Sequence, residues 1–398
     1  MATRIDCRCC GSKNIQTFLD LGKMPLAGGF LSSKDDQDIK YDLKINFCHD
    51  CSLVQISNVI DPEILFQNYS FSSSTVKPLH DHFDSFAEWL ISKTNGKKFF
   101  EFGCNDGIFL EKLNKRQVNT LGIDPSKNIT DIARSKKLDV ITGYFNTNSV
   151  ESIISEYGMF DVVSGSNVFA HNNDPSEILN SANLLLNDNG FLCLEVMYAY
   201  DLFEKFQWDT LYHEHLTFYS IKTIKDLLKR FGFKVIDAER IPMHGGSLRI
   251  LATKNNEISE TNNLKKLISD EESIHLNDFS TWINFGTKAS QKINIVKNIF
   301  SQISKNSNVW AYGAAGKSTL WINACEMNYL NGVADSSPLR AGKFVPGTKT
   351  EIFYPDYLKS DKPDIIFITA WNYKNNIVEN EKWFDGLWAV PLPDLSFF

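Results

Sequence analysis

Four consecutive residues in the run "WDTLYHEHLTFYS" carry groups that can move protons: Tyr212, His213, Glu214 and His215. A histidine of near-neutral pKa can remove a carbon-bound proton when the resulting carbanion is delocalised, as it is beside a ketone. A glutamate can orient and charge-stabilise that imidazole, and a tyrosine hydroxyl can donate to an enolate oxygen. The residue types therefore suit proton abstraction next to a carbonyl group, and a structural polar cluster is the alternative that the motif leaves open.

The spacing of these residues does not favour a metal site. Adjacent His-Glu-His differs from the His-x-x-x-His pattern that places two ligands on one face of a zinc-binding helix. In an extended segment alternate side chains share a face, so Tyr212 and Glu214 would point one way and His213 and His215 the other. Spacing alone therefore does not say which histidine acts.

The run "EFGCNDGIFLEKL" is a glycine-containing turn between an apolar strand and a helix. Glycines let a backbone approach a ligand at the amino end of a helix, and an acidic residue ending the next strand, Asp124, is placed to hold ribose hydroxyls. The G-x-G-x-x-G of dinucleotide binders is absent. Strand, E-x-G-x-x-x-G, helix and acidic strand end are the arrangement of class I S-adenosylmethionine (SAM) methyltransferases. The predicted cofactor-binding residues are Glu101, Gly103, Asn105, Asp106, Gly107, Asp124 and Asn167.

Five of the eight cysteines lie in the first 51 residues, and four of them form two Cys-x-x-Cys pairs. Two such pairs can supply four thiolates to one tetrahedral zinc, and a closed site of this kind is structural because it leaves no position for substrate. Four buried free cysteines are the alternative, and His49 is a possible substitute ligand. The predicted zinc ligands are Cys7, Cys10, Cys48 and Cys51.

Around these motifs, short apolar runs alternate with helical patterns, which predicts an α/β fold with a parallel sheet covered by helices. A helical pattern spans 264–303, and a second α/β unit begins near residue 308. We expect a small amino-terminal zinc-binding module at 1–75 and a central domain at 76–255. A helical linker and a carboxyl-terminal Rossmann-like domain are expected at 256–398.

The run "YGAAGKST" matches only the end of the P-loop pattern, because Ala311 stands where the first glycine of that pattern belongs. A glycine turn after a strand can still bind a phosphate through its amide groups, with Lys317 beside it. Phosphate binding without hydrolysis and a purely structural turn both remain open.

The composition limits the partners. A net charge of −7 argues against broad contact with a nucleic-acid backbone. No apolar run approaches the ~20 residues that span a bilayer, and the first residues have no apolar signal-peptide core. We therefore expect a soluble, cytoplasmic protein with no nucleic-acid or membrane partner.

Together the motifs resemble those of the bacterial sugar C-methyltransferases, which methylate carbon 3 of nucleotide-linked 4-keto deoxysugars. The resemblance covers essentially the whole chain, through "CRCCG" and "FCHDCSLVQ", then "EFGCNDG", "NVFAHNND" and "YHEHLTFYS", then "HGGSLRI", "YGAAGKSTL", "GKFVPGT" and "AWNYK". The order and combination of these blocks are more specific than any one of them.

This resemblance implies SAM as methyl donor, a structural zinc, and a sugar nucleotide held between the central and carboxyl-terminal domains. It implies that His215 is the base, with Tyr212, Glu214 and Tyr69 as partners, and no metal at the reaction centre. His171, His244 and Lys317 are the expected contacts to the sugar nucleotide. The alternatives are an O- or N-methyltransferase of the same fold and, from another class, a zinc-ribbon nucleic-acid-binding protein.

Overall fold

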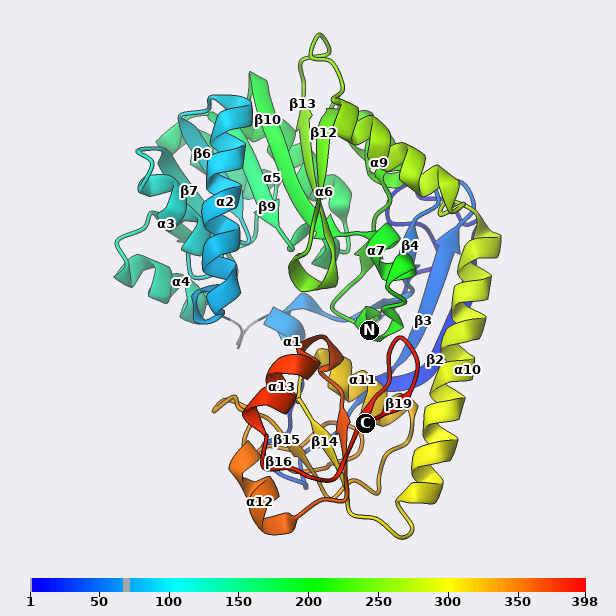
Figure 1. Ribbon diagram of the computed structural model, residues 1–398. Coiled ribbons are helices and arrows are strands. Elements are labelled where there is room, and N and C mark those ends of the chain that lie inside the picture. Colours follow the sequence, from blue (N-terminus) through cyan, green and yellow to red (C-terminus); the bar gives the residue numbers. More distant parts are fainter. Residues whose placement is uncertain (1, 67–71) are drawn as a thin grey trace.

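The computed structural model of the protein describes residues 2–66 and 72–398. In Figure 1 a central domain and a carboxyl-terminal domain lie at opposite ends of the molecule. The amino-terminal strands and the long helix α10 (Phe279–Ile303) run along one side of both domains. Among the described residues, no helix is both long and apolar enough to cross a bilayer.

The central domain is a seven-stranded sheet in the order β12-β13-β10-β9-β6-β7-β8. Five neighbouring strands are parallel, and the last strand of the domain, β13, lies antiparallel between β10 and β12. The central strands are buried and consist of near-continuous apolar residues. Such runs are expected where helices cover both faces of a sheet. The strands are β6 (Lys98–Phe102), β7 (Asn119–Asp124), β8 (Val140–Thr142), β9 (Phe160–Ser166), β10 (Leu186–Met197), β12 (Lys234–Ile241) and β13 (Ser247–Thr253).

Helices cover both faces of this sheet. Phe86 of α2 stacks on Phe109 of α3 with ring centroids 4.5 Å apart. The helices are α2 (Lys77–Thr94), α3 (Ile108–Asn114), α4 (Lys127–Ser135), α5 (Thr147–Tyr157), α6 (Pro175–Leu185), α7 (Ala199–Glu204) and α8 (Ile221–Arg230). Single 3-10 turns are η1 (Ser73–Thr75), η2 (Phe169–His171), η3 (Trp208–Thr210) and η4 (Met243–Gly245). Because the carboxyl ends of parallel strands share one edge, the segments that follow β6, β7 and β9 meet there.

The amino-terminal module forms an antiparallel sheet whose fourth strand comes from the central domain. This strand, β11 (Thr217–Phe218), follows His215 directly and pairs with β4. The segment that carries the histidines is therefore fastened to the module at its carboxyl end. The elements of the module are β1 (Ala2–Thr3), β2 (Ile15–Pro25), β3 (Lys40–Cys48), β4 (Val54–Ile56), β5 (Asn58–Val59) and α1 (Pro62–Phe66).

The predicted helical region at 264–303 consists of two helices, α9 (Asn262–Ser273) and α10. Gly286 of α10 lies so close to β2 that a Cβ there would meet the Phe18 carbonyl oxygen at 2.0 Å. The missing side chain lets the helix pack directly on the module, which fixes the module against the linker.

The carboxyl-terminal domain is a second α/β unit with the strand order β16-β15-β14-β17-β18-β19, parallel except for β19. This is the Rossmann-like arrangement that the sequence predicts. Its strands are β14 (Val309–Tyr312), β15 (Gly332–Ala334), β16 (Ile352–Phe353), β17 (Ile365–Ile368), β18 (Leu387–Val390) and β19 (Ser396–Phe397). Its helices are α11 (Gly316–Ala324), α12 (Leu358–Asp361) and α13 (Lys374–Asn380), with 3-10 turns η5 (Pro355–Tyr357) and η6 (Trp371–Tyr373).

Candidate active site

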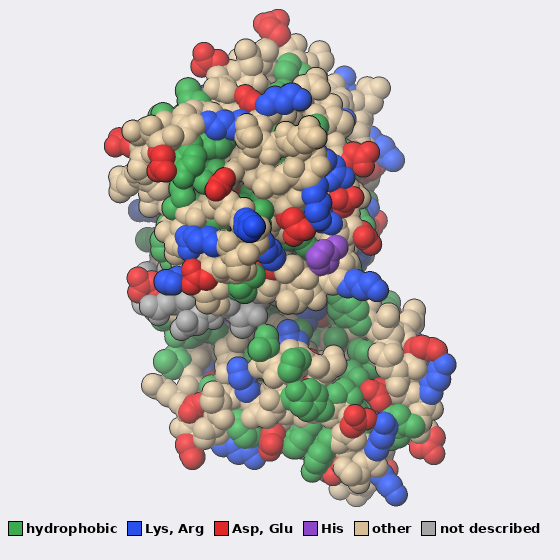
Figure 2. Space-filling view, turned by 90° about the vertical axis from the view of Figure 1, so that its left-hand side faces the viewer, with side chains coloured by type: hydrophobic (Ala, Val, Ile, Leu, Met, Phe, Trp, Pro, Cys, Tyr) green, Lys and Arg blue, Asp and Glu red, His purple; other side chains and the backbone are tan. Residues whose placement is uncertain are grey.

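A cavity of about 1030 Å³ lies where the three parts of the chain meet. The edge of the central sheet, the segment 26–30 of the module, and loops of the carboxyl-terminal domain line it. Figure 2 shows one face of the molecule, hollowed between its upper and lower lobes. Because two α/β domains share the lining, a cavity of this size suits two ligands, one bound by each of these domains.

Four of the predicted cofactor residues line one end of the cavity: Gly103, Asn105, Asp124 and Asn167. The Asp124 carboxylate accepts hydrogen bonds from the backbone N–H groups of Asn105 (3.0 Å) and Ser126 (2.9 Å). These bonds fix the carboxylate at the strand end where it borders the cavity, although burial raises its pKa. The geometry fits an acceptor of ribose hydroxyls.

The other three predicted cofactor residues do not line the cavity. Gly107 begins α3 with φ +78°, and a Cβ there would meet Leu138 at 2.4 Å, so this glycine serves packing. Asp106 accepts a hydrogen bond from Ser72 at 2.5 Å and further bonds from Ser74. These bonds hold the segment before α2 against the turn.

Glu101 lies beneath the turn and is 3% exposed. Burial, followed by the charges of Asp124 and Asp106, raises the pKa of this carboxyl. Its Oε2 atom has no hydrogen-bond partner among the described residues. A buried acceptor without a partner at the floor of the turn is consistent with a donor-bearing ligand, such as the SAM amino group, binding above it.

His215 has a fixed tautomer. Its Nδ1 lies 2.8 Å from the Thr210 carbonyl oxygen, and because a carbonyl can only accept, Nδ1 carries the proton and Nε2 the lone pair. The ring lies 4.0 Å from the Tyr212 ring and meets the His171 ring edge-on at 5.3 Å. Burial, and then the charge of His171, lowers the pKa of His215 well below its ordinary value. The imidazole is therefore neutral at physiological pH, as a general base must be.

The chain at 212–215 is a turn rather than a strand, so the predicted alternation of side chains is wrong. The His215 N–H donates to the Tyr212 carbonyl at 2.9 Å, which closes the turn. Tyr212, Glu214 and His215 all line the cavity as a result. A local backbone hydrogen bond overrides the period of two that an extended segment would impose.

His213 points away from this group and into the module. Its Nε2 lies 3.2 Å from the Asp42 carbonyl oxygen, and its ring packs edge-on against Tyr41 at 5.9 Å. It is 1% exposed. Of the two histidines in the motif, only His215 borders the cavity.

Two further predicted residues, His171 and His244, lie beside His215 on the cavity wall. Burial, followed by the charge of His244, lowers the pKa of His171 to about 4. His244 adopts a left-handed backbone conformation, with φ +53°, that is rare for a residue with a side chain. A strained residue of this kind, held on a cavity wall, is common at ligand-binding sites.

The carboxyl-terminal domain contributes cationic groups to the opposite end of the cavity. Lys317, from the first turn of α11, lies over the Trp371 ring at 4.8 Å, and its Nζ is 3.9 Å from Asp209 Oδ1. Arg340 and Lys343 line the same end. Neither residue is predicted from the sequence, although both follow the end of β15, where open α/β sheets bind ligands.

Gly316, which precedes Lys317, has a structural reason to be glycine. A Cβ at this position would lie 3.1 Å from the Tyr212 ring. The turn thus makes room for the Tyr212 side chain, which another domain contributes.

The segment 26–30 of the module forms part of the cavity wall, and no sequence motif predicts this. A Cβ at Gly28 would lie 3.3 Å from Glu214 Oε1. The Ala27 carbonyl accepts from Thr319 Oγ1 of α11 at 3.1 Å, and Leu31 forms an antiparallel bridge with Phe344. The module therefore contacts both α/β domains at the site.

The sulfur atoms of Cys7, Cys10, Cys48 and Cys51 all lie within 4.8 Å of one another. Two of the separations are 3.4 Å (Cys7 to Cys51) and 3.5 Å (Cys10 to Cys48). Four thiolates bound to zinc at about 2.3 Å are about 3.8 Å apart, so the cluster fits a tetrahedral zinc site.

Tyr69, which the sequence predicts as a partner of His215, lies outside the described residues.

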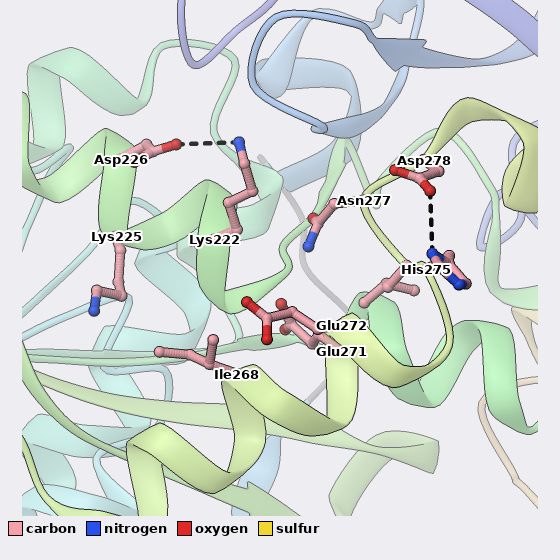
Figure 3. Close-up of a pocket in the computed structure, with 10 residues that line it drawn as sticks. Lys222, Lys225, Asp226, Ile268, Glu271, Glu272, His275, Asn277 and Asp278 are labelled. Carbon is pink, nitrogen blue, oxygen red and sulfur yellow. Dashed lines mark hydrogen bonds and ion pairs between the residues drawn. The ribbon is translucent and has the colours of Figure 1, made fainter.

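A second hollow, of about 470 Å³, lies between α8 and α9 and contains none of the predicted residues. Figure 3 shows two contacts at its wall: Lys222 pairs with Asp226 at 3.3 Å, and His275 Nδ1 lies 3.4 Å from Asp278 Oδ2. Two lysines and four acidic residues line this hollow, which does not suit an anionic ligand, and the larger cavity remains the candidate site.

Glu214→Gln is expected to change how stability depends on pH. Burial raises the pKa of Glu214 to about 7, so the folded state favours the neutral carboxyl. As pH rises from the ordinary value of 4.5 toward 7, the unfolded chain ionises first, and the wild type loses stability relative to the variant.

Denaturant unfolding of both proteins, without ligands, from pH 4.5 to 8 measures the difference. Glu151→Gln, at an exposed position of α5, controls for the loss of one carboxyl group. A stability difference between wild type and Glu214→Gln that stays constant over this range would contradict the expectation.

Three family models match consecutive parts of the chain. "Putative zinc binding domain" matches residues 7–66, "Methyltransferase domain" residues 79–238, and "C-methyltransferase C-terminal domain" residues 242–393. Together with the strand order, these matches show that the central domain is a class I SAM-dependent methyltransferase, which confirms the predicted fold. The matched module and its cysteine cluster suggest zinc.

The chain is similar over nearly its whole length to the C-methyltransferase NovU of Streptomyces niveus. The two are 28% identical over 98% of this chain and 96% of that protein. The ubiquinone biosynthesis O-methyltransferase of Pseudomonas aeruginosa is 27% identical over 34% of this chain and 60% of its own length. The full-length similarity and the matched carboxyl-terminal domain are thus both to C-methyltransferases.

Among solved structures, the magnesium protoporphyrin IX methyltransferase of Synechocystis PCC 6803 with bound SAM is similar to the chain. It has 17% sequence identity and a TM-score of 0.34, and the similarity covers 44% of this chain and 79% of that one.

Proposed function

We propose that the protein methylates carbon 3 of a nucleotide-linked 4-keto deoxysugar. The observation that supports this most is the neutral His215 imidazole, whose proton is held on Nδ1 and whose lone pair is on Nε2. It borders the same cavity as the turn of the methyltransferase domain and the cations of the carboxyl-terminal domain. Methylation at carbon requires such a base because the acceptor must first become a carbanion.

The residues at the central sheet edge would bind the donor. SAM, when bound, supplies an electrophilic methyl group on a sulfonium sulfur. Asp124 would accept from ribose hydroxyls, while Asn105 and Asn167 border the same space. The four cysteines would hold one zinc away from the reaction, in a purely structural role.

At the reacting carbon, His215 Nε2 would remove the proton on carbon 3, whose acidity the adjacent ketone raises. Tyr212 would donate its hydroxyl to the enolate oxygen at carbon 4, and Glu214 in its ionised form would stabilise the charged imidazole. The donor would then supply its methyl group to carbon 3, with the sulfonium sulfur as leaving group. The abstracted proton passes from His215 to solvent.

The far end of the cavity suits the nucleotide part of the acceptor. Lys317, Arg340 and Lys343 lie there; Lys317 and Arg340 also pair with Asp209 and Asp335, and the remaining excess of positive charge favours a diphosphate group. His171 and His244 line the same cavity, in which a sugar ring would bridge the nucleotide and the donor. The overall similarity to a C-methyltransferase along 98% of the chain supports the same proposal.

The test incubates the purified protein with SAM and a panel of thymidine- and uridine-diphosphate 4-keto sugars. The expected product carries one methyl group in place of one hydrogen on carbon. In heavy water without SAM, the proton on carbon 3 should exchange with solvent. If none of the keto-sugars in the panel leads to consumption of SAM, the proposed substrate class is wrong. If the methyl group appears on oxygen or nitrogen and no carbon-bound proton exchanges, the protein is an O- or N-methyltransferase.

A further inference from the structure

Asp209 is a buried carboxylate that joins two domains. It is 0% exposed and lies in η3, three residues before the turn at 212–215. Its Oδ2 atom accepts indole N–H bonds from Trp321 (3.0 Å) and Trp371 (2.6 Å), both of the carboxyl-terminal domain. Breaking such a charge-assisted bond inside a protein is costly, so the two domains are tied firmly at this point.

The other oxygen of Asp209 faces Lys317. Oδ1 has no hydrogen-bond partner among the described residues, and Lys317 Nζ lies 3.9 Å away. A buried carboxylate requires a compensating charge, and Lys317 supplies it while lying over the Trp371 ring. Asp209 and Trp371 together therefore restrain the ammonium group of Lys317 at the cavity wall.

The residue after Asp209 orients the proposed base. The Thr210 carbonyl accepts the Nδ1 proton of His215 at 2.8 Å. Within the same turn, the Thr210 N–H and hydroxyl both donate to the Gln207 carbonyl. The turn is rigid, so a shift of Asp209 also moves the carbonyl that fixes the His215 tautomer.

We propose that Asp209 is a positioning residue that sets both His215 and Lys317. It ties the turn that carries the Thr210 carbonyl to the tryptophans of the carboxyl-terminal domain, and its free oxygen holds Lys317. Proton abstraction and binding of the diphosphate then depend on one buried acid that touches neither the sugar nor the methyl donor. The role at His215 rests on the proposed function; the role at Lys317 requires only that a nucleoside diphosphate binds.

Asp209→Asn tests the proposal, because asparagine keeps the volume and an acceptor oxygen but removes the charge. Proton exchange on carbon 3 without SAM is expected to fall about 10- to 100-fold, as a small misplacement of a catalytic group does. The dissociation constant of thymidine or uridine diphosphate is expected to rise about tenfold, while that of SAM stays unchanged. A purely structural role would not separate these three measurements.

Glu381→Gln is the matched control. Glu381 is also buried and accepts an indole N–H, from Trp383 at 2.6 Å, together with the Tyr312 hydroxyl at 2.8 Å, yet it does not line the cavity. Glu381→Gln is expected to lower the melting temperature, while the rate of proton exchange and the nucleotide affinity stay within about twofold of the wild type. If Asp209→Asn behaves like this control, the proposal is overturned.

Trp371→Phe provides a second variant in case Asp209→Asn does not fold. It removes the shorter of the two indole bonds but keeps an aromatic ring beneath Lys317. Smaller decreases in proton exchange and in nucleotide affinity are expected, and if both stay unchanged the proposal is overturned.

If the wild type exchanges no proton of any keto-sugar, the proposed function fails. Asp209 is then judged by nucleoside diphosphate affinity alone, and an unchanged affinity in Asp209→Asn overturns its role.

Discussion

His215→Gln is expected to slow both methyl transfer and exchange of the proton on carbon 3 by roughly 10²- to 10⁴-fold, the usual contribution of a general base. Glutamine can still donate to the Thr210 carbonyl, as His215 Nδ1 does at 2.8 Å, but it has no lone pair that accepts a proton at neutral pH. SAM affinity should be unchanged. Single-turnover rates and exchange in heavy water measure the two steps separately.

His213→Gln is the matched control two residues away. Because His213 contacts Asp42 and Tyr41 of the module and does not line the cavity, its loss should lower stability and spare the rate per folded molecule. Normal exchange in His215→Gln, or an equal loss of rate in both variants, would exclude His215 as the base.

Cys48→Ser is expected to release the metal and unfold the amino-terminal module. Structural zinc sites contribute on the order of 10 kcal/mol to the folding of the small domains that hold them. Loss of the module's structure should also lower the rate of methyl transfer. The module supplies segment 26–30, the Leu31 bridge to Phe344, and strand β4, which pairs with β11 after His215. Methyl transfer should therefore fail while SAM still binds to the central domain.

Metal content by mass spectrometry, SAM binding by calorimetry, and methyl transfer are measured together. Cys9→Ser is the control, because Cys9 is buried in the same segment but lies outside the four-sulfur cluster. It should keep the metal and the activity. Full methyl transfer by a metal-free Cys48→Ser protein would show that the module does not support the active site.

Much of the fold could be predicted from local sequence. The apolar strands and the glycine turn before α3 encode the central sheet, since burial on both faces requires continuous apolar runs and the turn requires positive φ at Gly103 and Gly107. The two Cys-x-x-Cys pairs likewise predict the cluster that the fold assembles. By contrast, β12 and β13 are not predicted as strands: β12 mixes charged with apolar residues, and the HGGSLRI block extends into β13 without marking it as a strand.

One part of the candidate site was predictable because its residues follow strand ends. Asp124, Asn167 and Lys317 do so, and parallel sheets bring such positions to one edge. The segment 26–30 and Asp209 carry no local signal: Gly28 meets Glu214 across domains, and Asp209 meets two tryptophans more than 100 residues away in the chain. Contacts of that range depend on how whole domains pack.

The sequence by itself determined the class of chemistry. A Tyr-His-Glu-His run, a cofactor turn with an acidic strand end, and paired cysteines are local patterns, and local patterns encode backbone elements and the groups that they carry. Only the tertiary structure decided which histidine faces the cavity. One backbone hydrogen bond, from the His215 N–H to the Tyr212 carbonyl, turns the chain there. The module then takes His213, and the Thr210 carbonyl fixes the proton of His215. Side-chain direction and tautomer depend on partners that folding brings from elsewhere in the chain.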